Sequence, residues 1–348
     1  MKQYRVAILG ASGAVGQEMM KILAERSFPV GELHLLASAR SAGKVVSWQG
    51  RDIVVEEATD AAFAGMDIVL GAAENDIAER FAPAIVRSGA VFVDNSSAFR
   101  LDPNVPLVVP EINPGDVKLH HGIIANPNCS TIITLTAINA LRKLSPIHSM
   151  VVSTYQAVSG AGAGGPVELQ NEVDALRDGK AYAPKVFAHQ IAYNVIPQIG
   201  GEQCDGYTSE EMKLQNEGRK ILHLPDMNVA CTCVRVPVFY GHSESVNIET
   251  ERKLSAKEAR AILAQAPGVQ VYDNPSEKMY PLAVDAAGED ATYVGRIRED
   301  DTIPNGLNMW IVADNIRKGA ALNAVQIAEE LVRRDLLGVK DRTVFIKK

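Results

Sequence analysis

The fold is decided by Tyr4-Arg-Val-Ala-Ile-Leu-Gly-Ala-Ser-Gly-Ala-Val-Gly16, a short apolar run followed by a glycine-rich turn. Apolar residues with helical spacing begin at Met19, so the order is strand, glycine turn, helix. Gly10, Gly13 and Gly16 would let the backbone approach a pyrophosphate, and free N–H groups at the helix N-terminus would face that anion. The spacing differs from G-x-G-x-x-G, so a glycine turn without a ligand is the alternative.

The second expected strand, Glu32 to Ala37, runs into Ser38-Ala39-Arg40-Ser41. A site for NAD usually has an Asp or Glu near this point, which holds the ribose 2′-hydroxyl. An arginine between two serines suits the 2′-phosphate of NADP instead, because a guanidinium binds phosphate through charge-assisted hydrogen bonds. We therefore expect NADP in preference to NAD. The alternative is that Arg40 is a solvated surface residue.

Strands and helices alternate along the first third of the chain and return at its end. At the end of the chain, a strand expected at Asn308–Val312 leads into an amphipathic helix over Ala320–Arg334, whose length suits packing back onto the first domain. In the first third, further strands are expected at Asp67–Gly71, Ala90–Asp94 and Pro106–Val109, with a helix over about Asp76–Arg87. This alternation predicts a doubly wound α/β domain of the Rossmann type. Because no repeat or low-complexity linker separates the parts, a second domain is expected to be inserted into the first. The expected domains are 1–128 with 315–348 for NADP binding and 129–314 for catalysis.

Composition excludes several classes of protein. The 348 residues include 35 Lys and Arg against 42 Asp and Glu, and the formal net charge of −7 argues against a nucleic-acid or anionic-membrane binder. No uncharged apolar run approaches the ~20 residues that span a bilayer, and Met1 to Arg5 leads straight into a strand rather than a signal peptide. The 4 cysteines form neither a disulfide framework nor zinc-site spacing, so no metal is expected. We expect a soluble, cytoplasmic protein.

Cys129 is the best candidate nucleophile. It stands in Asn126-Pro-Asn-Cys-Ser-Thr131, between an expected strand at Gly122–Ala125 and an apolar helix that continues through Ile132. A helix N-terminus lowers the pKa of a thiol, and its free N–H groups can hold an oxyanion. Free cysteines are also common as small buried packing residues, and the local sequence does not decide between these roles.

Two charged residues on one expected helix are candidate site residues. The helix is expected to begin near Ser209, because Thr208 and Glu211 have the spacing of a capping box. It would bring Glu210 and Lys213 to one face, three residues apart. The alternative for this pair is an ordinary exposed ion pair.

A strand is expected over Val229–Phe239, and it carries Arg235. In a straight strand Arg235 and His242 would lie about 23 Å apart at ~3.3 Å per residue, so a shared site requires a bend. Pro237 or Gly241 would supply that bend. A histidine that follows a strand is otherwise usually structural or solvated.

Six motifs, each weak alone, occur along nearly the whole chain. They are Gly10-Ala-Ser-Gly-Ala-Val-Gly16, Asn95-Ser-Ser-Ala-Phe-Arg100, Asn126-Pro-Asn-Cys-Ser-Thr131, Gln156 with Ser159-Gly-Ala-Gly162, Arg235-Val-Pro-Val238 with Gly241-His242, and Asp314-Asn-Ile-Arg-Lys-Gly-Ala320. In this order they closely resemble aspartate-semialdehyde dehydrogenase. The resemblance, rather than the local pattern, favours Cys129 as nucleophile over Cys129 as a packing residue.

The resemblance implies a fold, a reaction and partners. The fold is a Rossmann-type nucleotide-binding domain with an inserted α+β catalytic and dimerisation domain. The family reduces L-aspartyl 4-phosphate with NADPH to L-aspartate 4-semialdehyde and phosphate, a step toward lysine, threonine and methionine. Cys129 would carry a thioacyl intermediate, because covalent catalysis divides one difficult step into two. A homodimer is implied, with the aspartyl phosphate, the semialdehyde and phosphate as its small-molecule partners.

The resemblance also implies roles for single residues. The catalytic residues are Cys129, His242 as general acid/base, and Gln156, which orients the acyl intermediate. The substrate-binding residues are Arg100 and Lys213 for phosphate, Glu210 and Arg235 for the amino group and α-carboxylate, and Asn128 beside the nucleophile. The cofactor-binding residues are Gly10, Ser12, Gly13, Ala14, Val15, Gly16, Ser38, Arg40, Ser41 and Asn315. The family's cofactor contacts from a Gly/Ser-rich loop do not carry over to Ala72-Ala-Glu-Asn-Asp76.

Two other functions are open. N-acetyl-γ-glutamyl-phosphate reductase has a similar glycine turn and a catalytic cysteine, but its cysteine neighbourhood usually reads differently. A catalytically silent, NADP-binding regulator would keep the fold and lose part of the site. The joint presence of Cys129, Gln156, Glu210, Arg235 and His242 argues against such a regulator.

Overall fold

The computed structural model describes residues 2–338, and the chain forms two compact units. The first unit is Met1–Asn128 with Ala320–Lys348, and the second is Cys129–Gly319. The expected functional division at 314/315 stays a prediction, and residues 339–348 of the expected NADP-binding domain lie outside the described residues. Among residues 2–338, none of the helices combines the length and apolar character that a bilayer crossing requires.

The first unit contains a seven-stranded sheet in the order β3-β4-β2-β1-β5-β6-β7. Its strands are β1 (Tyr4–Leu9), β2 (Val30–Ala37), β3 (Val45–Trp48), β4 (Arg51–Glu57), β5 (Ile68–Gly71), β6 (Val91–Asp94) and β7 (Ile123–Ala125). Within the described residues, neighbouring strands are parallel except for the antiparallel pair β3 and β4. The winding reverses at β1, and ligands of such sheets bind beyond the carboxyl ends of the strands at this point.

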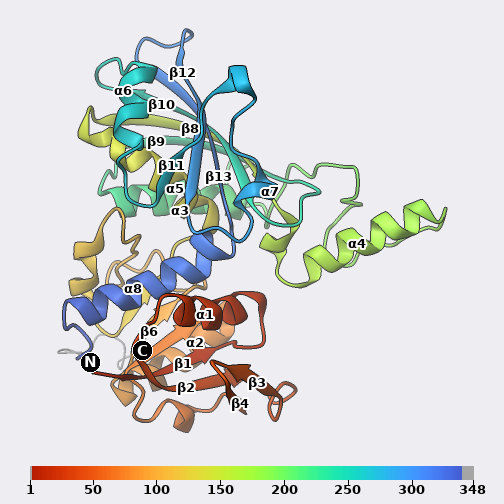
Figure 1. The fold of residues 1–348 in the computed structure, drawn as a ribbon, viewed down its shortest axis with the longest axis vertical. Helices are drawn as coiled ribbons and strands as arrows, with labels where there is room; N and C mark the ends of the chain where they lie inside the picture. The colour runs from red at the N-terminus through yellow and green to blue at the C-terminus, as the bar shows by residue number, and fades with distance from the viewer. Residues whose placement is uncertain (1, 339–348) are drawn as a thin grey trace. The chain divides into compact units, whose positions relative to one another are not determined.

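Helices cover both faces of this sheet, as the doubly wound prediction requires. They are α1 (Ala14–Glu25), α2 (Asn75–Ser88) and α8 (Leu322–Arg333). α8 lies beside α1 (Figure 1), and both contribute to one core with β1 and β5. α1 and α2 follow strands on opposite sides of the reversal, so right-handed connections put them on opposite faces.

The sequence predicts most of the first unit correctly. The strand, glycine turn and helix at the start are confirmed, as are the strands that became β2, β5, β6 and β7. The expected strand Pro106–Val109 is wrong, since Leu107 makes a single parallel bridge to Ala125. Pro106 and Pro110 flank it, and proline has no N–H to donate to a ladder.

The second unit contains a six-stranded sheet in the order β11-β12-β13-β10-β8-β9. Its strands are β8 (Ile147–Gln156), β9 (Asn228–Arg235), β10 (His242–Thr250), β11 (Val269–Val271), β12 (Thr292–Asp300) and β13 (Gly306–Ala313). Its helices are α3 (Cys129–Ile138), α4 (Gly164–Arg177), α5 (Ser209–Leu222), α6 (Ala256–Leu263) and α7 (Ala283–Ala286). α3, α5 and α6 pack against the sheet, and burial alternates along β8, as expected when helices cover one face.

Side chains of α5 bond the edge strand β9. The predicted capping box of Thr208 and Glu211 starts α5. Along the helix, Glu211 accepts from the Cys233 N–H at 3.0 Å, Gln215 donates to the Val229 carbonyl at 2.9 Å, and Arg219 donates to the Met227 carbonyl at 2.8 Å. These residues recur every fourth position, so they lie in one row along the helix. Glu211 and Gln215 thus satisfy backbone groups that the edge strand β9 would otherwise leave open, and Arg219 satisfies the residue just before it.

The glycine turn gives a prediction about stability. A Cβ on Gly16 would lie 2.4 Å from the Gly10 carbonyl oxygen, whereas a Cβ on Gly13 would meet the same oxygen at 3.4 Å. Gly16→Ala should therefore lower the free energy of unfolding by about 2 kcal/mol or more, because two backbone segments must separate. Gly13→Ala should lower it by less than about 1 kcal/mol. Urea denaturation of both variants measures the difference, and equal losses would contradict the packing described.

Candidate functional site

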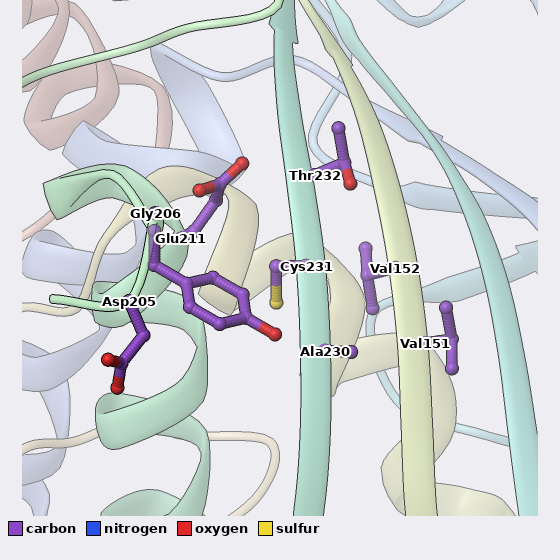
Figure 2. Close-up of a pocket in the computed structure, with 9 residues that line it drawn as sticks. Val151, Val152, Asp205, Gly206, Glu211, Ala230, Cys231 and Thr232 are labelled. Atoms are coloured by element: carbon purple, nitrogen blue, oxygen red, sulfur yellow. The ribbon is translucent and has the colours of Figure 1, made fainter. Parts of the chain in front are cut away.

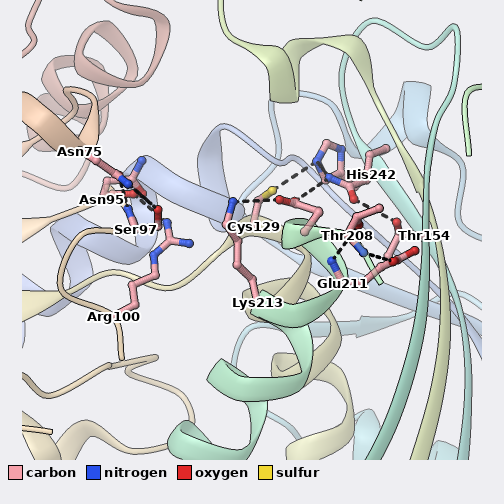
Figure 3. A network of polar contacts seen from close by, with 12 residues as sticks. Asn75, Asn95, Ser97, Arg100, Cys129, Thr154, Thr208, Glu211, Lys213 and His242 are labelled. Carbon is pink, nitrogen blue, oxygen red and sulfur yellow. Dashed lines mark hydrogen bonds and ion pairs between the residues drawn. The ribbon is translucent and has the colours of Figure 1, made fainter. Parts of the chain in front are cut away.

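The structure brings Cys129 and His242 together in the second unit. The Cys129 Sγ lies 3.3 Å from the His242 Nε2 (Figure 3). Cys129 is the first residue of α3, and His242 is the first residue of β10, which pairs with both β8 and β13. His242 is fully buried, whereas Cys129 keeps partial exposure. Of the two residues, Cys129 is therefore the more accessible.

The bend that the sequence required is present. β9 ends at Arg235, β10 begins at His242, and Gly241 between them has a φ of +87° that favours glycine. A Cβ added to Gly160 would lie 2.6 Å from an Arg235 guanidinium nitrogen and 3.1 Å from the His242 ring. The Gly160 backbone thus lies against both side chains and leaves no room for a side chain of its own, a role that sequence reasoning missed although the residue stands in a quoted motif. Arg235 is held by a 2.7 Å hydrogen bond to the Ala157 carbonyl.

Gln156 and Glu210 complete the cluster. Gln156 Nε2 donates to Glu210 Oε1 at 3.1 Å, and the Thr154 hydroxyl donates to Gln156 Oε1 at 3.0 Å. Lys213 forms an ion pair with Glu210 Oε2 at 3.1 Å. Glu210 is only 7% exposed, so the alternative of an ordinary exposed ion pair is wrong. The bonds leave the Gln156 amide in one orientation, with its nitrogen toward Glu210.

The imidazole of His242 is held neutral. The Ala157 backbone N–H donates to His242 Nδ1 at 3.0 Å. Burial, followed by the positive charge of Arg235, lowers the pKa of His242 to about 3, although Glu210 opposes this shift. A cation is costly at this position because water cannot reach it.

The thiol of Cys129 differs from the sequence prediction. A lowered pKa was expected from the helix N-terminus, but the pKa of Cys129 is raised to about 12. Burial is the main cause and the charge of Glu210 adds to it, whereas Arg235 and the Ser130 N–H lower the pKa by less. The helix terminus does act on the sulfur, but desolvation outweighs it. The resting group is therefore a thiol.

Glu244 is a buried carboxyl that sequence reasoning missed. It stands two residues after His242 on β10, and side chains two apart on a strand share a face. The Thr134 hydroxyl of α3 donates to Glu244 Oε2, while Oε1 has no hydrogen-bond partner within residues 2–338. Burial raises the pKa of Glu244 to about 8, against hydrogen bonds from Thr134 and Ser130. The two-residue spacing from His242 was the available signal.

Arg100 and Asn128 belong to the first unit. Arg100 is buried, and its guanidinium donates to the Asn126 carbonyl at 2.9 Å and to the Asn95 carbonyl at 2.8 Å. Asn75 lies in the segment Ala72–Asp76, to which the family's cofactor contacts do not carry over. Its amide nitrogen donates to the Ser97 hydroxyl, and its amide oxygen accepts from the Ser97 N–H, each at 2.9 Å (Figure 3). Backbone carbonyls therefore orient the Arg100 side chain.

The glycine turn can hold a pyrophosphate. Gly13 is the N-cap of α1, and no side chain caps this terminus or adds an acid to its first turn. A Cβ on Gly13 would meet only backbone oxygens, at 3.4 and 4.0 Å, so the space beside it is open. Ser12 precedes this terminus, and Ala14 and Val15 form its start. Uncapped N–H groups that face open space suit an anion.

Further candidate cofactor residues lie in both units. In the first unit, Ser38 and Arg40 are exposed after the carboxyl end of β2, and the buried Ser41 donates its N–H to the Ser38 carbonyl at 2.8 Å. In the second, Asn315 Oδ1 accepts from the Ser159 hydroxyl and the Gly241 N–H, each at 3.1 Å. Asn315 Nδ2 is buried without a hydrogen-bond partner in the described part of the chain. Such a donor fits a carboxamide oxygen, which nicotinamide has.

A separate hollow of about 450 Å³ lies against β9 (Figure 2). Its lining includes the loop 205–207, Glu211 and Cys231. The Glu211 carboxylate already has hydrogen-bond partners within the fold, because its oxygens accept from the Thr208 N–H at 2.7 Å and the Cys233 N–H at 3.0 Å. None of the residues that line the hollow is a predicted site residue. It is distinct from the cluster around Cys129.

Comparison with protein families gives matches to both parts of the chain. Residues 5–120 match the family model described as semialdehyde dehydrogenase, NAD binding domain. Residues 138–318 match the one described as semialdehyde dehydrogenase, dimerisation domain.

Similar proteins of known identity cover nearly the whole chain. An aspartate-semialdehyde dehydrogenase of Aquifex aeolicus is 52% identical over 96% of this chain and 99% of its own. The Bacillus subtilis protein of the same name is 47% identical over 95% and 98%. The crystal structure of aspartate semialdehyde dehydrogenase II complexed with ASA from Vibrio cholerae has a TM-score of 0.93 at 44% identity, covering 96% of this chain and 99% of that one. The Candida albicans enzyme with NADP has a TM-score of 0.73 at 25% identity, covering 96% and 99%.

Glu244 gives a prediction about stability and pH. Its pKa is 4.5 as an ordinary carboxyl and about 8 in the folded chain, so the folded state keeps a proton that the unfolded state releases between these values. Wild-type stability should therefore fall as pH rises through this window. Glu244→Gln removes this titrating carboxyl, so the melting temperature of the variant should rise relative to wild type from about pH 5 to about pH 8. Calorimetry at both pH values tests this, with the exposed Glu251→Gln as control; a constant difference would refute it.

Proposed function

The chain belongs to the aspartate-semialdehyde dehydrogenase family, and from this premise we propose how its own residues carry out the reaction. The reaction is the NADP-dependent reductive dephosphorylation of L-aspartyl 4-phosphate to L-aspartate 4-semialdehyde, in lysine, threonine and methionine biosynthesis. The observation that carries the proposal is the 3.3 Å contact between the Cys129 Sγ and the His242 Nε2. A partly exposed cysteine beside a buried histidine suits a nucleophile and its polar partner.

Cys129 is the proposed nucleophile. Its sulfur attacks the acyl carbon of the substrate and displaces phosphate, which leaves a thioester on the enzyme. Because the resting group is a thiol, its proton must leave in this step, and the departing phosphate can take that proton as it becomes hydrogen phosphate. The N–H of Ser130, which already lowers the pKa of the thiol, favours negative charge at this place.

Charged residues around the nucleophile are proposed to recognise the amino acid. Arg235 would bind the α-carboxylate and Glu210 the amino group, a division that matches the two opposite charges of an amino acid. Gln156, held in one orientation by its bonds, would position the acyl oxygen. Lys213 would bind phosphate, as the resemblance implies. For the first unit the resemblance implies phosphate binding by Arg100, and either a phosphate contact or support of the oxyanion by Asn128.

NADP is the cofactor, and the described residues fit it. The open, uncapped N-terminus of α1 suits the pyrophosphate, and Ser38, Arg40 and Ser41 suit the 2′-phosphate. The unpartnered donor of Asn315 suits the nicotinamide carboxamide. When bound as NADPH, the cofactor supplies the hydride that reduces the thioester.

A homodimer formed through the second unit is part of the proposal. The face of the sheet opposite α3 and α5 exposes 52% of Val151 and 38% of Tyr155, and Tyr155 packs on Trp310 with ring centres 5.4 Å apart. An apolar sheet face of this kind suits a protein partner. The dimerisation-domain match over residues 138–318 supports a second copy of the chain as that partner. A cytoplasmic location stays a prediction.

The comparisons favour this function over the two alternatives. The cited relatives and solved structures are aspartate-semialdehyde dehydrogenases, which supports aspartyl phosphate over the N-acetyl-glutamyl analogue. A silent regulator would not need an intact cluster, and the proposed catalytic and substrate residues of the second unit lie together.

The substrate assay tests the function directly. Purified enzyme should reduce NADP in a phosphate-dependent way with L-aspartate semialdehyde and not with N-acetyl-glutamate semialdehyde. Cys129→Ala should lower kcat at least about 1000-fold, because the thioester can no longer form. Cys204→Ala, at an exposed cysteine, is the matched control and should keep wild-type kcat. Activity with the N-acetylated substrate alone would overturn the assignment.

Arg40 gives a prediction about cofactor choice. Arg40→Ala should weaken NADP binding by about tenfold to a hundredfold, because a charge-assisted bond to the 2′-phosphate is lost, and leave NAD binding within about twofold. Arg51→Ala is the matched control, since this exposed arginine begins β4 and lies at the opposite edge of the parallel strands. Titration of both cofactors measures the effect. Equal losses for NAD and NADP in Arg40→Ala would exclude a 2′-phosphate contact.

A further inference from the structure

A long segment without helix or strand lies beside Arg235. Residues 178–208 join α4 to α5, and they form only turns, bends and isolated bridges. Ile196 of this segment exchanges two backbone hydrogen bonds with Arg235, at 2.9 and 2.8 Å. Irregular segments of this length are uncommon inside a compact unit unless they carry function. The contacts that order the segment therefore bear on the Arg235 site.

The carboxylate of Glu168 on α4 binds three successive backbone N–H groups of this segment. Lys185, Val186 and Phe187 donate to it at 2.7, 2.8 and 2.9 Å. Consecutive N–H groups that converge in this way form an anion-binding concavity, and here the anion is a side chain of the same protein. Glu168 is only 2% exposed, so water competes little for these bonds. The backbone at Phe187 is therefore fixed to α4.

Glu172 makes the same kind of contact one turn further along α4. It is also buried, and its Oε2 accepts from the N–H groups of Ile191 at 2.8 Å and Ala192 at 2.7 Å. Residues four apart lie on one face of a helix, so a single face of α4 carries both carboxylates. Ile191 and Ala192 also share a buried apolar cluster with Leu169 of α4. The segment is thus attached to α4 on both sides of residues 188–190.

The attached backbone places the ring of Phe187 against Arg235. The ring centre lies 5.9 Å from the guanidinium carbon, within the range of a cation–π contact. Arg235 is only 5% exposed, and such a contact is stronger at a desolvated cation than at a surface one. The Ala157 carbonyl accepts from the same guanidinium at 2.7 Å. The ring and the carbonyl together restrict how the guanidinium is oriented.

We propose that Phe187 is a positioning residue for substrate recognition, whose ring holds the Arg235 guanidinium in the orientation that receives the α-carboxylate. Glu168 and Glu172 act one step further away, because they hold the backbone that carries this ring. The inference rests on the proposed function, in which Arg235 binds the α-carboxylate, and deepens it. A guanidinium binds a carboxylate through two parallel hydrogen bonds only when its plane is aligned with that carboxylate. Because the α-carboxylate does not react, its alignment contributes equally to the bound substrate and to the transition state, and so it affects KM rather than kcat.

Steady-state kinetics of Phe187 variants tests the proposal. Phe187→Ala should raise KM for L-aspartate semialdehyde about threefold to thirtyfold, because the cation–π contact is lost, while kcat and KM for phosphate stay within about twofold. Phe187→Leu keeps an apolar side chain without a ring and should raise the same KM, whereas Phe187→Tyr keeps the ring and should have the wild-type KM. Tyr193→Ala is the matched control, since this aromatic residue of the same segment is 78% exposed, and it should behave as wild type.

The pattern across these variants decides the outcome. An unchanged KM for the semialdehyde in Phe187→Ala would overturn the inference, and so would an equal rise in KM for phosphate. A Tyr variant with the KM of the Leu variant would exclude a role for the ring. Glu168→Gln should raise KM for the semialdehyde by less than Phe187→Ala does, and should add nothing to it in the double variant, because both act through one contact.

Amide hydrogen exchange of the full-length enzyme tests the attachment without substrate. Glu168→Ala should raise exchange at Lys185, Val186 and Phe187 at least about tenfold, because their N–H groups lose an acceptor. Glu168→Gln keeps one acceptor oxygen and should give a smaller rise, and the exposed Glu202→Ala should give none.

Two results of the exchange experiment would contradict the positioning role of Glu168. One is the absence of a rise in either Glu168 variant, and the other is a rise spread over the whole second unit in both. Wild-type enzyme that is inactive on L-aspartate semialdehyde would instead defeat the proposed function. The exchange result would then still show whether Glu168 orders the segment.

Discussion

The hydrogen bond from the Ala157 amide to His242 Nδ1 is the constraint on which the chemistry of the second unit depends. It joins the end of β8 to the start of β10, and so couples the sheet to the imidazole. The ring cannot turn or take a second proton without losing this bond. Burial also raises the pKa of Cys129 and of Glu244 and lowers that of His242, so desolvation is the main cause of all three shifts.

Positively charged side chains lie at this cluster, although the chain as a whole carries a net negative charge. The chain carries −7 overall, yet the reaction that it catalyses has anionic substrates and products. Arg235 faces the nucleophile from β9, and Lys213 neutralises the buried Glu210. Burial favours the protonated form of Glu244. Its ionisation would place a second negative charge near the sulfur and raise the pKa of the thiol further. An acidic surface and a cation-lined site are therefore compatible.

The sequence predicted those features that depend on neighbours along the chain. The glycine turn, the capping box of Thr208 and Glu211, and the bend at Gly241 all follow from local backbone requirements. The pKa of Cys129 was predicted with the wrong sign, because the opposing burial and the charge of Glu210 come from segments far away in sequence. The contact of Gly160 with two side chains and the Ala157 bond involve backbone atoms, which no residue pattern reports. Glu244 differs, since its spacing from His242 was visible but carried no chemical motif.

Helix α5 serves two demands at once. One side of it carries Glu210 and Lys213, which are proposed to hold the substrate, and the row beginning at Glu211 bonds the open edge of β9. An uncovered edge of this kind recruits strands from other molecules and starts aggregation. Substrate recognition and colloidal solubility are therefore tied to adjacent residues of one helix. Evolution of a new specificity through α5 is restricted to changes that leave this edge covered.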